Sequence, residues 1–214
     1  SSLAKDFRII GIDSRGHGKS TLGNTVLTYE RMQHDAEAVL KHLDISSASI
    51  LGFSDGGTVA LRIAATKSIK VEKLIVIGAS WNVKELAGSE EMYKEITPES
   101  AKSMFSDYFA QYQKMNQEPD FNKFTTSVVA LWLDKGKTGY PNEKVSSIDA
   151  PVLLIRGDKD FLTSLASMAE LAGVLKDVAF LNVPFAEHVV YVEQKDVCET
   201  ILHQFLSAAH KACE

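Results

Sequence analysis

The stretch Ala48–Ala60 limits the possible folds of this chain more than any other. An apolar, β-prone run ends at Gly52, Ser54 follows two residues later, and small residues then open an alanine-rich segment. A strand that turns directly into a helix has a cramped backbone, and glycines beside the turn let neighbouring segments approach closely. The stretch therefore predicts a strand, a sharp turn and a helix, with the Ser54 hydroxyl held out at the carboxyl end of the strand.

The segments on either side of this turn predict the sheet. Phe7–Asp13 and Lys73–Ala79 are short apolar runs with β-branched residues, and each is typical of a buried strand. Thr28–Leu43 has apolar residues at helical spacing after a threonine cap. Strands that alternate with helices and are almost wholly apolar indicate a parallel sheet covered on both faces. We therefore expect an α/β fold with a mostly parallel sheet and helices on both faces.

The alternation stops in the middle of the chain. From Trp81 to about Ile148 no segment has a clear strand pattern, and helical stretches lie between turns. Counted from Trp81 to Tyr140, this part holds 10 of the 18 aromatic residues. We expect residues 81–148 to form a helical cap or lid, and residues 1–80 and 149–214 to form the core. Aromatic side chains of the cap would wall a pocket over Ser54, although any one of them could simply pack the cap onto the core.

Strand and helix patterns resume at Ala150. A buried strand leads into Gly157-Asp158-Lys159-Asp160, a helix is expected from about Ser164 to Lys176, and the last strand covers 178–183. His188 follows this last strand, a position at which a histidine is more often structural than catalytic. A closing amphipathic helix is expected from Tyr191 to about Lys211.

Composition excludes several classes of protein. The 214 residues suit one α/β domain, and the formal net charge of −5 argues against a protein that binds nucleic acid or anionic membranes. No segment has the length of a membrane span, and the amino terminus lacks the apolar core of a signal peptide. Cys198 and Cys213 have no metal-ligand spacing and fit reduced thiols. We expect a cytoplasmic protein without a metal or another cofactor.

Two turns and one chain order resemble the α/β-hydrolase superfamily. Residues 52–56 form the Gly-x-Ser-x-Gly nucleophile elbow, and residues 13–20 match an Asp-x-Arg-Gly-x-Gly-x-Ser turn of that superfamily. The order Ser54, Asp160, His188 is the order of its catalytic triad. The resemblance implies a serine esterase that cleaves a small carboxylic ester, with Ser54 as the nucleophile, His188 as the base and Asp160 as the acid that orients the base.

The resemblance also bears on the choice of acid and on the substrate. The superfamily usually carries its acid in a Gly-x-x-Asp turn after a strand, which favours Asp160 over Asp158. Gly-Phe-Ser-Asp-Gly-Gly is similar to the elbow of valacyclovirase-like hydrolases of amino acid esters, which implies that the Asp55 side chain binds a substrate amine. The Asp55 backbone N–H would stabilise the oxyanion. Phe53, Trp81 and Trp132 are the expected substrate contacts.

The resemblance leaves one part of the fold unaccounted for. It starts at residue 7, and the family's amino-terminal strands and His-Gly oxyanion loop have no counterpart in this sequence. Either the 214 residues are a fragment of a longer polypeptide, or the protein has lost these strands. If they are lost, the Phe7 segment would either flank the elbow strand directly or leave a groove where the missing strand belongs. Loss of one oxyanion donor would cost about 3 to 4 kcal/mol of transition-state stabilisation.

Two alternatives of other classes stay open. The first is a catalytically silent protein with the same fold that binds a small ligand or a protein, which loss of the oxyanion loop would favour. The second is a phosphate-loop protein, because Gly18-Lys19-Ser20 follows an expected strand. Against the second, Asp13 stands where that loop needs a glycine, and the residues that follow do not open a helix.

Overall fold

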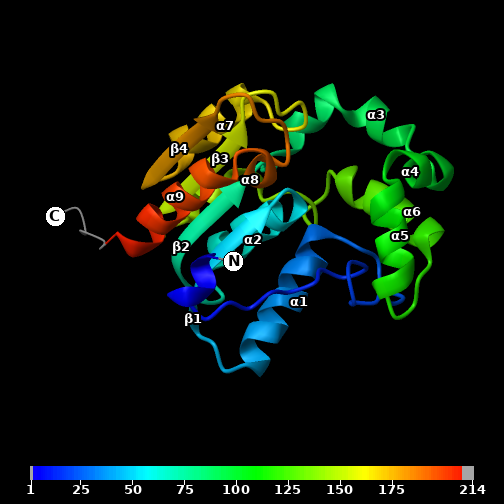
Figure 1. Ribbon diagram of the computed structural model, residues 1–214, viewed down its shortest axis with the longest axis horizontal. Coiled ribbons are helices and arrows are strands. Elements are labelled where there is room, and N and C mark those ends of the chain that lie inside the picture. Colours follow the sequence, from blue (N-terminus) through cyan, green and yellow to red (C-terminus); the bar gives the residue numbers. More distant parts are fainter. Residues whose placement is uncertain (1, 209–214) are drawn as a thin grey trace.

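The computed structural model describes residues 2–208, a four-stranded sheet surrounded by helices (Figure 1). The strands are β1 Ser47–Phe53, β2 Lys70–Ile77, β3 Val152–Gly157 and β4 Val178–Val183. The helices are α1 Tyr29–His42, α2 Asp55–Thr66, α3 Glu90–Lys94, α4 Pro98–Met104, α5 Ser106–Met115, α6 Phe121–Trp132, α7 Leu165–Val174, α8 Val190–Glu193 and α9 Lys195–Ser207, with 3-10 turns η1 Ser2–Lys5, η2 Val83–Gly88 and η3 Asn142–Ser147.

The sheet is parallel throughout, as the sequence predicted. Its strand order is β1-β2-β3-β4, and each strand pairs in parallel with the next. Every residue of β3 is buried, which agrees with its apolar sequence and its place between two strands. The order leaves β1, the strand that leads to Ser54, with a partner on one side only among the described residues.

Helices cover both faces of the sheet, and the alternation of side chains along the strands explains how. On β2, Leu74 and Val76 belong to a core cluster with residues of α2 and α7. Their neighbours Ile75 and Ile77 point the other way, into a cluster with Leu202 of α9. The prediction of an α/β fold with helices on both faces is confirmed.

The amino-terminal segment differs from the prediction. Phe7–Asp13 was expected to be a buried strand, but residues 8–14 are in neither helix nor strand, and Ile9 is 53% exposed. The expectation was wrong because a β-branched apolar run forms a strand only beside a ladder partner, and residues 8–13 form no ladder with β1. The segment instead borders a groove along β1.

The predicted helices before and after the sheet are found with small changes. Thr28 caps α1 by accepting a hydrogen bond from the backbone N–H of Arg31. The closing helix is divided into α8 and α9 by a break at Gln194. Cys198 is buried in α9, whereas Cys213 and the predicted helix end near Lys211 lie outside the described residues.

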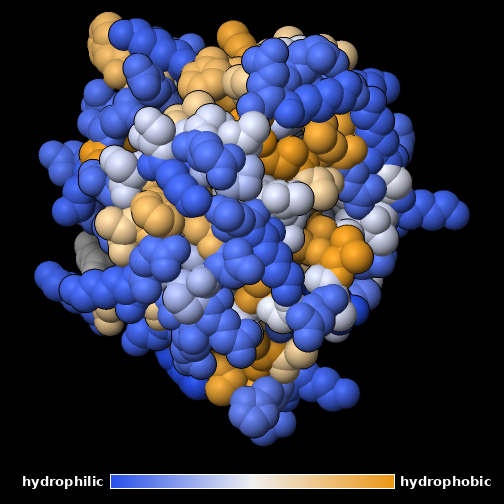
Figure 2. Space-filling model, turned by 90° about the vertical axis from the view of Figure 1, so that its right-hand side faces the viewer, coloured by the Kyte–Doolittle hydropathy of each residue, from blue (hydrophilic) through white to orange (hydrophobic). Residues whose placement is uncertain are grey.

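Residues 81–148 contain η2, α3, α4, α5, α6 and η3, and no strand. Most of their aromatic rings pack against one another rather than over the sheet; Phe121 and Phe124, for example, lie in one cluster with Tyr112. The side of the molecule that carries α4, α5 and α6 shows hydrophobic patches within a mostly hydrophilic surface (Figure 2). Within residues 2–208 no helix combines the length and the apolar character needed to cross a bilayer.

Candidate active site

Ser54 lies in a strained turn between β1 and α2. Its φ of 51° and ψ of −122° are rare for a residue with a side chain. Its backbone N–H donates to the carbonyl of Ile77 at 2.9 Å, and its carbonyl accepts from Gly57 at 2.8 Å. A Cβ at Gly52 would lie 2.2 Å from the carbonyl oxygen of Gly56, so only glycine allows α2 to start this close to β1. The predicted strand, turn and helix are therefore confirmed.

The structure brings together the three side chains predicted from the chain order. Ser54 Oγ lies 3.1 Å from His188 Nε2, and His188 Nδ1 lies 2.9 Å from Asp160 Oδ2. Asp158, the alternative acid, is exposed, whereas Asp160 is 4% exposed. A hydroxyl, an imidazole and a carboxylate thus form one hydrogen-bonded row across the carboxyl ends of β1, β3 and β4.

Further hydrogen bonds fix the Asp160 carboxylate. Its Oδ1 accepts from the backbone N–H groups of Leu162 and Thr163 at 2.9 and 3.1 Å. Burial alone would raise the pKa of Asp160, but the hydrogen bond and charge of His188 and the two backbone donors outweigh it and hold the pKa below its ordinary value. The carboxylate is therefore ionised at neutral pH. The buried Arg156 guanidinium donates to the carbonyls of Asp160 and Thr163, which anchors the turn to β3.

The turn that carries Asp160 and the loop that carries His188 pack backbone against backbone. A Cβ at Gly157 would lie 2.1 Å from the carbonyl oxygen of Glu187, and Lys159 donates its N–H to the carbonyl of Ala186 at 2.9 Å. Glu187 directly precedes His188 in this loop. Its side chain is exposed and its N–H donates to Glu193, so the loop accommodates this residue.

Asp55 is the first residue of α2, and its carboxylate joins three elements. Tyr29 of α1 donates its hydroxyl to Oδ1 at 2.7 Å, and the indole N–H of Trp132 of α6 lies 3.1 Å from Oδ1 and 3.0 Å from Oδ2. Burial, and after it the charge of Asp55, raise the pKa of Tyr29 well above its ordinary value, so the phenol keeps its proton. Both partners are neutral, so these two hydrogen bonds stabilise the negative charge of Asp55 without neutralising it.

The predicted substrate contacts take three different positions. The Phe53 ring packs on the His188 ring with centroids 4.9 Å apart, and Trp132 bonds to Asp55 as described. Trp81 is 3% exposed, and its indole N–H donates to the backbone carbonyl and hydroxyl of Ser167. Trp81 is therefore better described as a core residue than as a substrate contact, because its ring is buried and its indole N–H is already hydrogen-bonded inside the protein.

Three residues at or beside the site were not singled out from the sequence. Tyr29 lies three residues before Met32 on the buried face of α1, so helical spacing could have placed it in the core, although not against Asp55. The Tyr93 ring packs against the Trp132 ring at a centroid distance of 5.0 Å. Arg156 is a charged residue inside an apolar strand, and a buried charge needs hydrogen-bond partners. This pattern could have indicated that Arg156 binds the turn that follows the strand.

Nothing within residues 2–208 groups three or more His, Cys, Asp or Glu side chains in a way that could hold a metal ion. The chemistry that this site can perform with its own groups is proton transfer through His188 and nucleophilic attack by Ser54.

Comparisons with known proteins show what this chain is similar to in sequence and in fold. A family model described as alpha/beta hydrolase fold matches residues 1–97. The chain is similar to an AB hydrolase superfamily protein of Bacillus subtilis, with 25% identity over 94% of this chain and 82% of the relative. It is also similar to a protein of Haemophilus influenzae named a putative esterase/lipase, with 26% identity over 96% of this chain and 76% of the relative.

Among solved structures, the chain resembles a meta-cleavage product hydrolase of Pseudomonas fluorescens with a TM-score of 0.79 and 19% identity, over 96% of this chain and 81% of that one. This likeness shows that the chain has the same fold.

Proposed function

From the premise that this chain is a hydrolase with the α/β-hydrolase fold, we propose that it cleaves small carboxylic esters by acyl transfer through Ser54, His188 and Asp160. The observation that carries the proposal is the hydrogen-bonded row from Ser54 Oγ through His188 to Asp160, with distances of 3.1 and 2.9 Å. Relatives named as esterases support the choice of substrate class.

In the first half of the reaction, His188 Nε2 takes the hydroxyl proton as Ser54 Oγ attacks the ester carbonyl carbon. Asp160 accepts a hydrogen bond from His188 Nδ1–H, which leaves Nε2 without a proton and able to accept the proton of Ser54. The carboxylate also stabilises the imidazolium that forms. The Asp55 N–H, at the first position of α2, has no acceptor within the helix and donates to the oxyanion.

The first half ends when the ester C–O bond breaks, the imidazolium gives its proton to the departing alcohol, and the acyl group stays on Ser54 Oγ. In the second half, His188 takes a proton from water, and the hydroxide oxygen attacks the acyl carbon. Collapse of this second tetrahedral intermediate returns the proton to Ser54 and releases the carboxylic acid. The strained turn at Ser54 keeps the hydroxyl in place through both halves.

We further propose that the preferred esters carry a protonated amine, bound at Asp55. The carboxylate accepts hydrogen bonds from two neutral donors, Tyr29 and Trp132, and a carboxylate has room for about four in total. An ammonium group could therefore add to the carboxylate without displacing either donor. The Tyr93 and Trp132 rings supply aromatic surface beside it, which favours a cation further.

We propose that residues 81–148 act as a cap over this site, with 1–80 and 149–214 as the core. Trp132 supports this role, because a residue of α6 reaches the residue that follows Ser54. The cap would thereby contribute one wall of the site and limit the size of the ester.

Hydrolysis of short-chain p-nitrophenyl esters tests the acyl-transfer proposal. The wild-type protein should release p-nitrophenol with an initial burst, and Ser54→Ala should reduce turnover to the level of buffer alone. Equal turnover by folded Ser54→Ala protein would overturn the proposal. A folded wild-type protein without turnover would support the catalytically silent binding protein instead.

The amine preference is tested by comparing an alanine ester with the matching propionate ester. Asp55→Asn keeps the backbone N–H and an acceptor oxygen but removes the charge. The ratio of kcat/KM for the two esters should fall by about 10- to 100-fold in this variant. An unchanged ratio would show that Asp55 holds Tyr29 and Trp132 in place and does not bind substrate.

A further inference from the structure

A glycine directly follows β2, the strand that lies between those leading to Ser54 and Asp160. The sheet order places β2 between β1, which leads to Ser54, and β3, which leads to Asp160. Because the carboxyl ends of parallel strands lie at one edge of the sheet, the hydrogen-bonded row from Ser54 to Asp160 crosses the end of β2. Gly78 is the first residue after β2, so it lies beside this row.

Backbone hydrogen bonds hold Gly78 between the elbow and β3. The carbonyl of Ile77 accepts from the N–H of Ser54 at 2.9 Å, and the N–H of Gly78 donates to the carbonyl of Ile155 at 2.9 Å. Gly78 has a φ of 53°, which lies in the left-handed region that favours glycine. The backbone at position 78 is therefore fixed from both sides.

A side chain at position 78 would meet the hydrogen bond between His188 and Asp160. A Cβ there would lie 3.2 Å from Asp160 Oδ2 and 3.3 Å from both Nδ1 and Cε1 of His188. Oδ2 and Nδ1 are the two atoms that this hydrogen bond joins, and they lie 2.9 Å apart. The contacts of the added carbon would be shorter than the favourable separation of about 3.5 to 4.0 Å, so one partner would have to shift.

The imidazole is the partner that would shift. The Asp160 side chain has no exposed surface, and two backbone N–H groups fix its other oxygen. The His188 side chain is 16% exposed, and its ring packs on the Phe53 ring with centroids 4.9 Å apart. A methyl group at position 78 would therefore move the imidazole, and Nε2 would leave its place 3.1 Å from Ser54 Oγ.

We propose that Gly78 is a positioning residue of this site, which places the His188 imidazole together with Phe53. Gly78 leaves free the space in which Nδ1 approaches Asp160, while Phe53 packs on the ring. The proposal rests on the proposed acyl-transfer function, because Gly78 acts on turnover only through His188 as the base.

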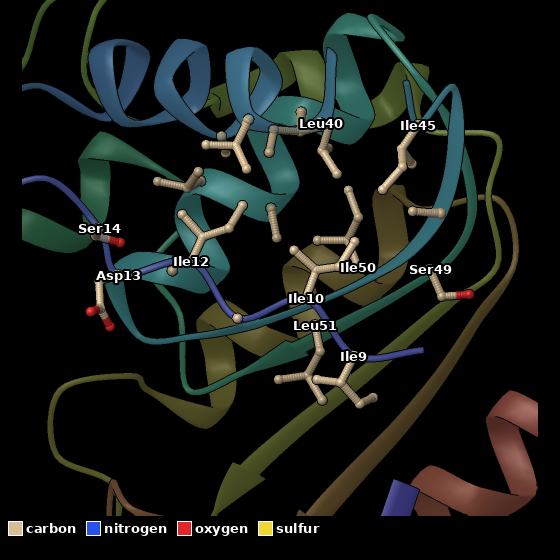
Figure 3. Close-up of a pocket in the computed structure, with 18 of the residues that line it drawn as sticks. Ile9, Ile10, Ile12, Asp13, Ser14, Leu40, Ile45, Ser49, Ile50 and Leu51 are labelled. Atoms are coloured by element: carbon tan, nitrogen blue, oxygen red, sulfur yellow. The ribbon is translucent and has the colours of Figure 1, made fainter. Parts of the chain in front are cut away.

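The residues that position the imidazole lie apart from the cavity of about 1000 Å³ along β1 (Figure 3). Ile10 and Leu51 are among the residues that line this cavity, whereas Phe53, Gly78 and His188 do not line it. The contacts that place the imidazole are therefore separate from that cavity.

Kinetics of Gly78→Ala test the proposal, because this variant adds only the methyl group. A displaced base costs turnover and not substrate binding, so kcat for a p-nitrophenyl ester should fall by about 10- to 100-fold, with KM changed by less than about twofold. Gly23→Ala is the matched control, since Gly23 has a φ of 67° and its Cβ would meet only Arg15 Nη1, at 3.1 Å. Equal losses of kcat in both variants, or none in Gly78→Ala, would overturn the proposal.

Proton NMR tests the positioning without any turnover. The Nδ1 proton of His188, which is hydrogen-bonded to the Asp160 carboxylate, should give a separate downfield resonance that His188→Gln abolishes. Gly78→Ala should move this resonance upfield or remove it through faster exchange with water, whereas Gly23→Ala should leave it in place. An unchanged resonance in folded Gly78→Ala would contradict the proposal. If the resonance changes as expected but the wild type has no turnover, the positioning is supported and the acyl-transfer function is not.

A double-mutant cycle covers the case in which Gly78→Ala fails to fold. In the His188→Ala background the methyl group has no imidazole to meet, so Gly78→Ala should lower the urea midpoint by about half as much as in the wild type, or less. Folding of Gly78→Ala only in the His188→Ala background would support the same contact. Equal effects in both backgrounds, or failure of both proteins to fold, would show that the left-handed backbone alone requires glycine, and would refute the positioning role.

Discussion

Replacing Asp160 by asparagine tests the hydrogen-bonded row at its buried end. In the native site, Asp160 Oδ2 accepts a hydrogen bond from His188 Nδ1–H, and Oδ1 accepts hydrogen bonds from the backbone N–H groups of Leu162 and Thr163. An asparagine that keeps its oxygen toward the two backbone donors turns its NH₂ group toward His188. The imidazole then accepts at Nδ1 and carries its proton on Nε2, so it can no longer take the proton of Ser54.

The expected loss follows from this change of tautomer. A base that carries its proton on the wrong nitrogen lowers kcat by about 1,000- to 10,000-fold. The fold should be retained, because the backbone donors of the turn keep their acceptor and the Arg156 anchor binds the backbone carbonyl, which the substitution leaves in place. The free energy of unfolding should fall by about 1 kcal/mol, the net value of one hydrogen bond.

The assay is steady-state hydrolysis of a p-nitrophenyl ester, with urea unfolding measured on the same preparations. Asp158→Asn is the matched control, because Asp158 is exposed two residues away, and it should retain wild-type activity. Activity of Asp160→Asn within tenfold of the wild type would refute the assigned role. Equal losses in both variants would show that the turn matters only through its conformation.

Three further predictions concern packing, the link between α6 and the elbow, and pH. Gly52→Ala should lower the free energy of unfolding by about 3 kcal/mol in urea titrations, because its Cβ meets the Gly56 backbone, whereas Gly173→Ala, with open space around it, should be neutral or slightly stabilising. Trp132→Phe should raise KM for an amine ester by about 3- to 10-fold with little change in kcat, because the Asp55 carboxylate loses one donor; an unchanged KM would contradict the link. Tyr29 has a raised pKa, so it stays protonated in the folded protein while unfolded tyrosines ionise near pH 10, and stability should fall as the pH rises above about 10. Urea midpoints that are constant from pH 8 to about 11 would contradict this assignment.

The sequence predicted those helices and strands for which the local residue pattern and the packing in the folded protein favour the same structure. The helix at Thr28, the elbow around Ser54 and the strands of the sheet each have a pattern that one physical cause explains: a cap, a close approach or continuous burial. Asp160 and His188 were predicted from the resemblance of the chain order Ser, Asp, His to that of the α/β-hydrolase superfamily. The parallel sheet brings both residues to one edge, because the carboxyl ends of its strands lie there.

Other features depend on partners that a local pattern cannot reveal. The Phe7–Asp13 run has the composition of a strand but forms no ladder, since pairing and not composition decides whether a strand forms. The contacts of Tyr29 and Trp132 with Asp55 join residues 26 and 77 positions apart, which no helical or strand period links. Trp81 was assigned to the pocket by its residue type, but its indole N–H donates a hydrogen bond to Ser167 inside the core.

Labelling with a fluorophosphonate tests the central claim most directly, because this reagent reacts with a serine only when a neighbouring base activates it. We predict one covalent adduct per chain, located on Ser54 by peptide mass spectrometry, and much slower labelling of His188→Gln. Folded wild-type protein that carries no adduct, or an adduct on another serine, would contradict the claim that Ser54, His188 and Asp160 act together.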